Sequence, residues 1–447
     1  MSELIPSLAG VVVAVVVTVA LFVAANLVLD QAVRRYRLFA TITGGVLGVV
    51  VGALANSGGW FLGGPLWPLG GALLGALLGG LVVGRRPLSR ERAQRLADRL
   101  RPAVFLFPAL LFLSVGLVIP TIRTGYLSLR SRRSEEFIGF GNYREIFGDR
   151  TIFSWTGFGN IFTSRLFIAA AVIALIAVLV TVARSRGGRY AIDLSAPVPV
   201  ISLSAAASLV VLAMVGAMRG VIWNNVFWVV IVTGVSTVLG LAIAVLADRA
   251  RGESVAKSLI FLPMAISFVG ASVIWRFVYA WEPAGSSQIG VLNAAWVALG
   301  GVPQAWTSQR PWNSLFLMVI MIWIQTGFAM VVLSAAIKGV PSELREAALV
   351  DGATEAQAFW RVTLPYVRST VAVVITTLII LVLKVYDIVK VMTNGLSGTD
   401  VIANRMFDEA FIARDIGVGS ALAVLLFLAV VPLMFINARR ARREEAT

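Results

Sequence analysis

Apolar runs of about twenty residues recur along the chain, and they constrain the fold more than any other feature. Each run is long enough to cross roughly 30 Å of hydrocarbon as an α-helix. The 447 residues are 58% hydrophobic and only 14% charged. We therefore expect an all-α polytopic membrane protein.

The net charge of +15 could indicate a nucleic-acid partner. The positive residues, nearly all Arg, instead form short clusters beside the apolar runs, as the positive-inside bias requires. We predict about eleven spans in a bacterial-type plasma (inner) membrane, with the N-terminus outside, the C-terminus in the cytoplasm, the lipid bilayer as partner and no nucleic acid. The clusters that set this topology are at Arg34, Arg85, Arg184, Arg249 and Arg439.

The residue types exclude several kinds of chemistry. The sequence has no Cys and no His, which removes disulfides, thiolate and imidazole metal sites and His-based catalysis. No buried nucleophile is paired with a base, so we do not expect an enzyme. A GxxxxGK[ST] phosphate-binding loop is also missing from the sequence. If ATP drives this protein, the nucleotide is bound by another chain.

The first part of the chain divides by composition. Residues 1–84 are expected to form three membrane helices, 85–101 a basic cytoplasmic linker helix, 102–150 a further membrane helix with an outer loop, and 151–223 a transmembrane hairpin. The predicted helices in the first and last of these segments are Leu8–Leu29, Leu38–Ala55, Leu66–Val83, Leu166–Val182 and Pro199–Met218.

The later part, residues 224–440, is expected to hold five membrane helices before a cytoplasmic tail, 441–447. An outer segment around Ile289–Leu299 is too short to span, and its tryptophans, Trp281, Trp296, Trp306 and Trp312, are expected at headgroup depth rather than stacked on sugar. Asp400–Asp415 forms an outer amphipathic stretch. The predicted spans are Asn225–Ala247, Ser258–Tyr279, Trp312–Ile337, Tyr366–Val391 and Gly417–Ile436.

A polar segment, 341–368, separates two of these helices and carries clear helix signals. Ser342 is placed to N-cap a short helix, and Gly352 can supply the left-handed residue that ends it. Thr354 and Gln357 have the spacing of a capping box for a second short helix. The segment is therefore predicted to be a rigid helix-turn-helix.

The string EAALVDGA within this segment, followed by Phe359 and Leu364-Pro365, resembles the EAA loop of binding-protein-dependent ABC importer permeases. The resemblance implies that residues 341–365 form a cytoplasmic coupling helix seated on a separate ATPase subunit. It implies a six-helix core, a second permease subunit, an ATPase dimer that binds ATP and Mg, and an extracytoplasmic solute-binding protein. The implied contact residues are Glu346, Ala347, Ala348, Asp351, Gly352, Ala353, Phe359, Leu364 and Pro365.

Three further strings, including AKSLIFLPMAISFVGASVIWRFVYAW, resemble the α-glucoside permeases of the maltose-type family and imply a sugar substrate. Only Gln325 is polar among the positions that match the family's sugar-contacting residues, whereas a pyranose site normally needs several hydrogen-bonding side chains. Much of the selectivity is therefore expected to belong to the binding protein. The matching positions are Met321, Gln325, Phe328, Leu378, Leu381, Val382 and Val385.

Three ionisable residues, Lys384, Asp387 and Lys390, recur at three-residue spacing within one predicted span. An i, i+3 ion pair can form there. Since Lys384 lies about 24 Å along the helix from Arg368, at ~1.5 Å per residue, snorkelling toward the outer interface is favoured over a gating role. An ion-coupled secondary transporter using Asp387 is the alternative function.

Overall fold

The computed structural model describes residues 113–186, 197–248 and 252–444, with a few single positions before them. Within these ranges the secondary structure is helical, apart from one isolated β-bridge between Arg130 and Phe137. The chain divides into two compact units, Met1–Ile122 and Arg123–Thr447. The three predicted N-terminal helices and the basic linker lie outside the described residues, so the eleven-span topology stays a prediction.

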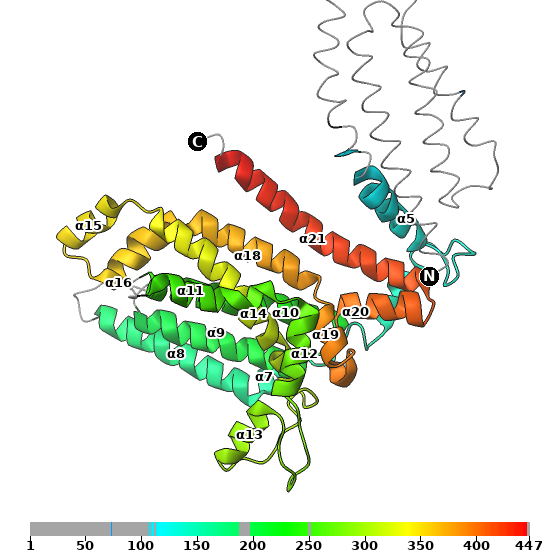
Figure 1. The fold of residues 1–447 in the computed structure, drawn as a ribbon, viewed down its shortest axis with the longest axis horizontal. Helices are drawn as coiled ribbons and strands as arrows, with labels where there is room; N and C mark the ends of the chain where they lie inside the picture. The colour runs from blue at the N-terminus through cyan, green and yellow to red at the C-terminus, as the bar shows by residue number, and fades with distance from the viewer. Residues whose placement is uncertain are drawn as a thin grey trace, which may run out of the picture. The chain divides into compact units, whose positions relative to one another are not determined.

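The second unit is built around α10 (Val221–Ala247) and α14 (Trp312–Lys338), which pack along their length (Figure 1). A glycine permits this close contact, because a Cβ added at Gly240 would lie 2.5 Å from Cβ of Ala329. α18 (Arg368–Leu383) packs against both helices. This bundle carries the buried apolar core.

The predicted inserted hairpin is present as α8 (Arg165–Arg186) and α9 (Pro197–Ala217), which lie side by side (Figure 1). Together with α10 and α14 they give four described helices long and apolar enough to cross a membrane, or up to six when two bent helix pairs are counted as spans. The last described helix of the chain is α21 (Ile416–Glu444). The all-helical membrane class is therefore confirmed.

The expectation of one straight helix over Ser258–Tyr279 is wrong. The chain forms α11 (Glu253–Phe261), a 3₁₀ turn (η2, Leu262–Ala265) and then α12 (Phe268–Val278), with a bend of 101°. Two local features explain the break. Pro263 lies at the start of the 3₁₀ turn, and the Ser267 side chain caps α12 by accepting a hydrogen bond from Gly270 N at 3.1 Å.

The expectation of one helix over Tyr366–Val391 is also wrong. α18 ends at Leu383, and α19 (Asp387–Met392) begins after three residues outside either helix. Lys390 pairs with Asp408 at 2.7 Å and lies over the Phe407 ring, instead of joining Asp387. The break removes the helix that a Lys384–Asp387 pair required, whereas Asp387 and Lys390 share α19 and Lys390 pairs with Asp408 instead.

The end of the core opposite segment 341–368 is held together by buried amides and one arginine. Asn224 donates to the carbonyls of Gly398 and Asp400, and Arg310 donates to Gly398 O at 2.7 Å. Burial raises the pKa of the Asp400 carboxyl above its ordinary value. The elements at this end are α13 (Val291–Ala298), α19, α20 (Ile402–Phe407) and η5 (Asp408–Ile412) (Figure 1).

Candidate functional site

Segment 341–368 folds as the helix-turn-helix that its caps predict. α15 (Ser342–Val350) is terminated by Gly352, which lies just beyond the C-cap residue Asp351. The φ of Gly352 is +87°, the left-handed conformation expected there. Gly352 N bonds Leu349 O and Ala353 N bonds Ala348 O, both at 3.0 Å. These two bonds are the Schellman arrangement that satisfies the last carbonyls of a helix.

The expected cap at Ser342 is absent. Ser342 is the first helical residue, Pro341 holds the N-cap position, and no side chain caps α15. The second helix, α16 (Glu355–Ala358), has the predicted capping box: Gln357 N donates to Thr354 Oγ1, and Thr354 N donates to Gln357 Oε1.

A π-helical turn (η3, Phe359–Thr363) and a short helix (α17, Leu364–Tyr366) lead from α16 to the membrane helix that follows. Pro365 lies in the first turn of α17, as a helix start allows. Residues Glu355–Tyr366 make an angle of 68° with α18. The membrane helix predicted to start at Tyr366 therefore begins at Arg368, after this bend.

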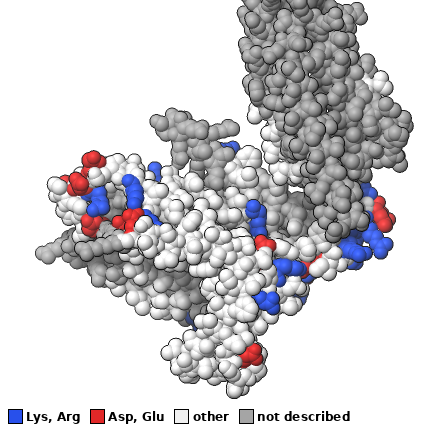
Figure 2. Space-filling view, in the orientation of Figure 1, with Lys and Arg blue, Asp and Glu red and all other residues white. Residues whose placement is uncertain are grey.

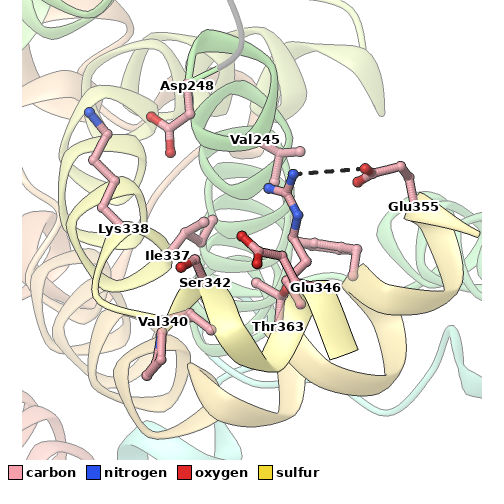
Figure 3. Close-up of a pocket in the computed structure, with 12 residues that line it drawn as sticks. Val245, Asp248, Ile337, Lys338, Val340, Ser342, Glu346, Glu355 and Thr363 are labelled. Carbon is pink, nitrogen blue, oxygen red and sulfur yellow. Dashed lines mark ion pairs between the residues drawn. The ribbon is translucent and has the colours of Figure 1, made fainter. Parts of the chain in front are cut away.

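A pocket of about 370 Å³ lies between α15 and the ends of α10 and α14 (Figure 3). Arg345 and Glu355 form an ion pair of 3.8 Å across it, marked by the dashed line in Figure 3. Both partners are about half exposed, so this pair contributes little to stability. The pocket lies between segment 341–368 and the ends of the long helices α10 and α14. Its wall residues include Val245, Asp248, Lys338, Ser342, Glu346 and Thr363.

A network of charged and polar side chains joins α10, α11 and α14 near segment 341–368. Lys257 on α11 pairs with Asp248, the C-cap of α10, and with Glu253 at 2.6 Å. Ser334 on α14 donates to Asp248 at 2.7 Å, and Lys338 pairs with Glu253. Because Lys257 and Asp248 are mostly buried, with side chains 17% and 14% exposed, loss of one partner leaves a poorly solvated charge.

One face of α15 is open to solvent and mixes charge with apolar groups. Glu346, Ala347 and Asp351 are exposed, and Val350 is 87% exposed. Leu344 on the same helix is also exposed. Figure 2 shows charged side chains gathered over this end of the bundle, whereas the surface beside it is mostly uncharged. This face of α15 is therefore left uncovered by the part of the chain that the structure describes.

The other predicted contact residues occupy different depths in the loop. Ala348, Ala353, Phe359 and Leu364 are half-buried, whereas Pro365 is exposed like Gly352. No heavy atom lies within 4 Å of a Cβ built at Gly352. The loop therefore has room for a side chain at this position, but its backbone conformation favours glycine.

The predicted sugar-path residues lie on α14, α18 and the turn after α18, and most pack into the core of this chain. Gln325 is buried, and Phe328 and Leu381 are partly buried against the same core. The path itself stays a prediction. The members buried in two hydrophobic clusters of the core are Met321, Leu378, Val382 and Val385.

Sequence reasoning missed the network of Asp248, Lys257 and Ser334. Asp248 and Ser334 are 86 residues apart, and their contact depends on how α10 packs against α14. The only local signal is the spacing of Glu253 and Lys257, which form an i, i+4 pair.

Known proteins match this chain over most of its length. The model of the family described as binding-protein-dependent transport system inner membrane component matches residues 236–445. The osmoprotective compounds uptake permease protein GgtC of Synechocystis sp. is 45% identical over 342 residues, covering 76% of this chain and 99% of that protein. The alpha-glucoside transport system permease protein AglF of Rhizobium meliloti is 42% identical over 355 residues, covering 79% and 86%.

The fold is also similar to a solved structure of a bacterial ABC transporter involved in the import of the acidic polysaccharide alginate. The TM-score is 0.52 at 18% identity, over 78% of this chain and 99% of that chain. This structural likeness supports the helical fold, and the sequence identities to GgtC and AglF support membership of one family. The chain therefore belongs to the family of binding-protein-dependent transport system inner membrane components.

Proposed function

We propose that this chain is the membrane-spanning subunit of an ATP-driven ABC importer that carries a sugar, an α-glucoside being the favoured class. Family membership gives the transport role. The observation that carries the coupling mechanism is the open face of α15, where Glu346 and Val350 stand exposed above a rigidly capped turn. Because α15 lies in the chain between the membrane helices α14 and α18, a displacement of α15 can be passed on to both of them.

The proposed mechanical path runs from α15 to the ends of α10, α11 and α14. An ATPase subunit that closes on α15 would move a helix joined to α14 through Gly339, Val340 and Pro341. Lys257 on α11 then connects to α10 by its ion pair with Asp248 and to α14 by donating a hydrogen bond to Ser334. Because charged groups with little solvent access resist separation, these helix ends are expected to move together.

The proposed assembly contains a second permease subunit, an ATPase dimer and an extracytoplasmic solute-binding protein. ATP and Mg would be held by the ATPase, since this sequence has no phosphate-binding loop. The chain itself would need no cofactor and catalyse no reaction. The α-glucoside assignment is supported by the relative AglF, named as an alpha-glucoside permease, while the relative GgtC is named for osmoprotective compounds.

Affinity purification of this chain from the membranes of cells that also express the proteins encoded by neighbouring genes tests this function. We expect an ATPase subunit to co-purify, and ATP hydrolysis in proteoliposomes to rise when the binding protein and an α-glucoside are added. Uptake should persist when ion gradients are collapsed. Uptake that needs an ion gradient but no ATPase would instead support a secondary transporter and contradict the proposal.

The Gln325→Leu variant is expected to lower α-glucoside uptake modestly without changing which sugars are accepted. A net hydrogen bond is worth only ~0.5–1.5 kcal/mol when water can replace the lost partner. Initial uptake rates of several α-glucosides, compared with wild type, check this result. Complete loss of one sugar with full retention of another would show a discriminating site in this subunit.

A further inference from the structure

A second cavity, of about 530 Å³, lies at the outer end of α12. Its volume is within the roughly 300–1,000 Å³ typical of small-molecule pockets. Arg276 comes from α12, Trp281 follows that helix, and Thr307 and Ser308 come from the segment before α14. Met392 at the end of α19 closes another side. The cavity therefore gathers parts of the chain that are more than a hundred residues apart.

The polar groups that line this cavity are not used by the fold. Within the part of the chain that the structure describes, no ion pair or side-chain hydrogen bond involves Arg276, and the same holds for the hydroxyls of Thr307 and Ser308. Trp281 is 47% exposed and forms no ring pair there. By contrast, the hydroxyl of Tyr279 donates to Phe316 O at 3.0 Å, so Tyr279 is part of the wall.

The wall of the cavity is held in place by buried contacts. The fully buried amide of Asn293 donates to Ala280 O at 2.9 Å and to Gln304 O at 3.0 Å, and it accepts from Gln304 N at 2.9 Å. A Cβ at Gly290 would lie only 2.1 Å from Ala280 O, so this contact requires glycine. Both sides of the rim are thereby fixed before any ligand arrives, which reduces the entropy lost on binding.

The lining specifies the chemistry of the ligand. Arg276 is its one charged residue, and with no carboxylate in the lining, a cation or an amine has no counter-charge there. An indole face beside two hydroxyls and a guanidinium suits a ring that is apolar on its faces and carries hydroxyls around its edge. A pyranose has this shape. Of the four tryptophans predicted at headgroup depth, Trp281 lines the cavity, whereas Trp296 and Trp306 pair with each other.

We propose that this cavity is an outer subsite for a glycoside, in which Trp281 stacks on the pyranose and Arg276, Thr307 and Ser308 bond its hydroxyls. The inference rests on the proposed sugar-transport function and adds a binding site outside the predicted path on α14 and α18. It also relieves the shortage of polar groups along that path, where Gln325 is the single polar side chain. A sugar leaving the binding protein would be held here first.

A photoactivatable probe tests the subsite directly. Methyl α-glucoside bearing a diazirine is added to the assembled transporter in phosphatidylcholine nanodiscs, and adducts are mapped by peptide mass spectrometry. We expect adducts within 273–281 and 305–308 that unmodified methyl α-glucoside removes and mannitol does not. Trp281→Ala should lower this labelling about threefold to tenfold, because an aromatic contact is lost.

Trp312→Ala is the matched control, since Trp312 is 51% exposed and does not line the cavity. Its labelling should equal that of wild type. Labelling that persists in Trp281→Ala, or that resists competition by the sugar, overturns the subsite. Labelling displaced by phosphatidylglycerol in the disc but not by sugar assigns the cavity to a lipid headgroup and also overturns it. Uptake of α-glucoside is measured in parallel, so normal uptake without labelling refutes the subsite alone, whereas absent uptake refutes the proposed function.

Discussion

Gly352→Val is expected to lower α-glucoside uptake by about tenfold or more while the chain still reaches the membrane. The φ of Gly352 is +87°, a conformation that costs an L-residue roughly 1–2 kcal/mol, and more for a β-branched side chain. Relaxing this strain rotates α15 away from the position fixed by its two terminal hydrogen bonds. Uptake and ATP hydrolysis, each normalised to the amount of chain in the membrane, measure the effect.

Gly352→Asn separates backbone strain from partner contact. Asn tolerates the left-handed region better than other residues with side chains. Beyond the two chain neighbours, no described residue has an atom within 4 Å of a Cβ at this position. If strain alone matters, Gly352→Asn should keep most of the uptake. If both variants lose uptake, the side chain meets a partner surface. Wild-type uptake in Gly352→Val would show that α15 is not the coupling helix.

Lys257→Met is expected to destabilise the protein by about 3–5 kcal/mol, because it leaves the mostly buried carboxylate of Asp248 without its counter-charge. Glu253 keeps Lys338 as partner. The double variant Asp248→Asn, Lys257→Met removes both charges and should recover much of the loss. Thermal aggregation midpoints of the detergent-solubilised protein compare the variants.

Lys338→Met is the matched control, because it removes one positive charge by the same substitution. Lys338 is 53% exposed, so its ion pair with Glu253 is expected to contribute about 0–1 kcal/mol. Equal midpoints for Lys257→Met and Lys338→Met would mean that the Lys257 network does not hold the helix ends together. A double variant no more stable than Lys257→Met would lead to the same conclusion.

Local chemistry determined the elements that could be predicted from the sequence alone. The run of apolar residues placed α14 within one residue of its expected bounds, and the inserted hairpin appears as α8 and α9. The left-handed turn at Gly352 and the capping box of Thr354 with Gln357 were also predicted. These features depend on residues at most a few positions apart, so a sequence pattern contains all of their causes.

The two helix breaks show where such patterns stop being sufficient. An apolar run has the same hydropathy whether its helix is straight or bent, so Ser258–Tyr279 and Tyr366–Val391 were predicted as single helices. Pro263 was visible in the sequence, but Pro also occurs in continuous membrane helices when neighbouring groups satisfy the freed backbone. After the second break, Lys390 forms an ion pair with Asp408, which lies 18 residues further along the chain.

The candidate sites divide in the same way. The sequence by itself predicted the short helices of segment 341–368, because the residues that form their caps and turn are contiguous. Only the tertiary structure brought Ser334 to Asp248, and Trp281 to Thr307 and Met392, since α10, α14 and the outer segments had to pack before those side chains could meet. Contacts between residues far apart in the chain depend on the summed packing of whole helices, which no local spacing records.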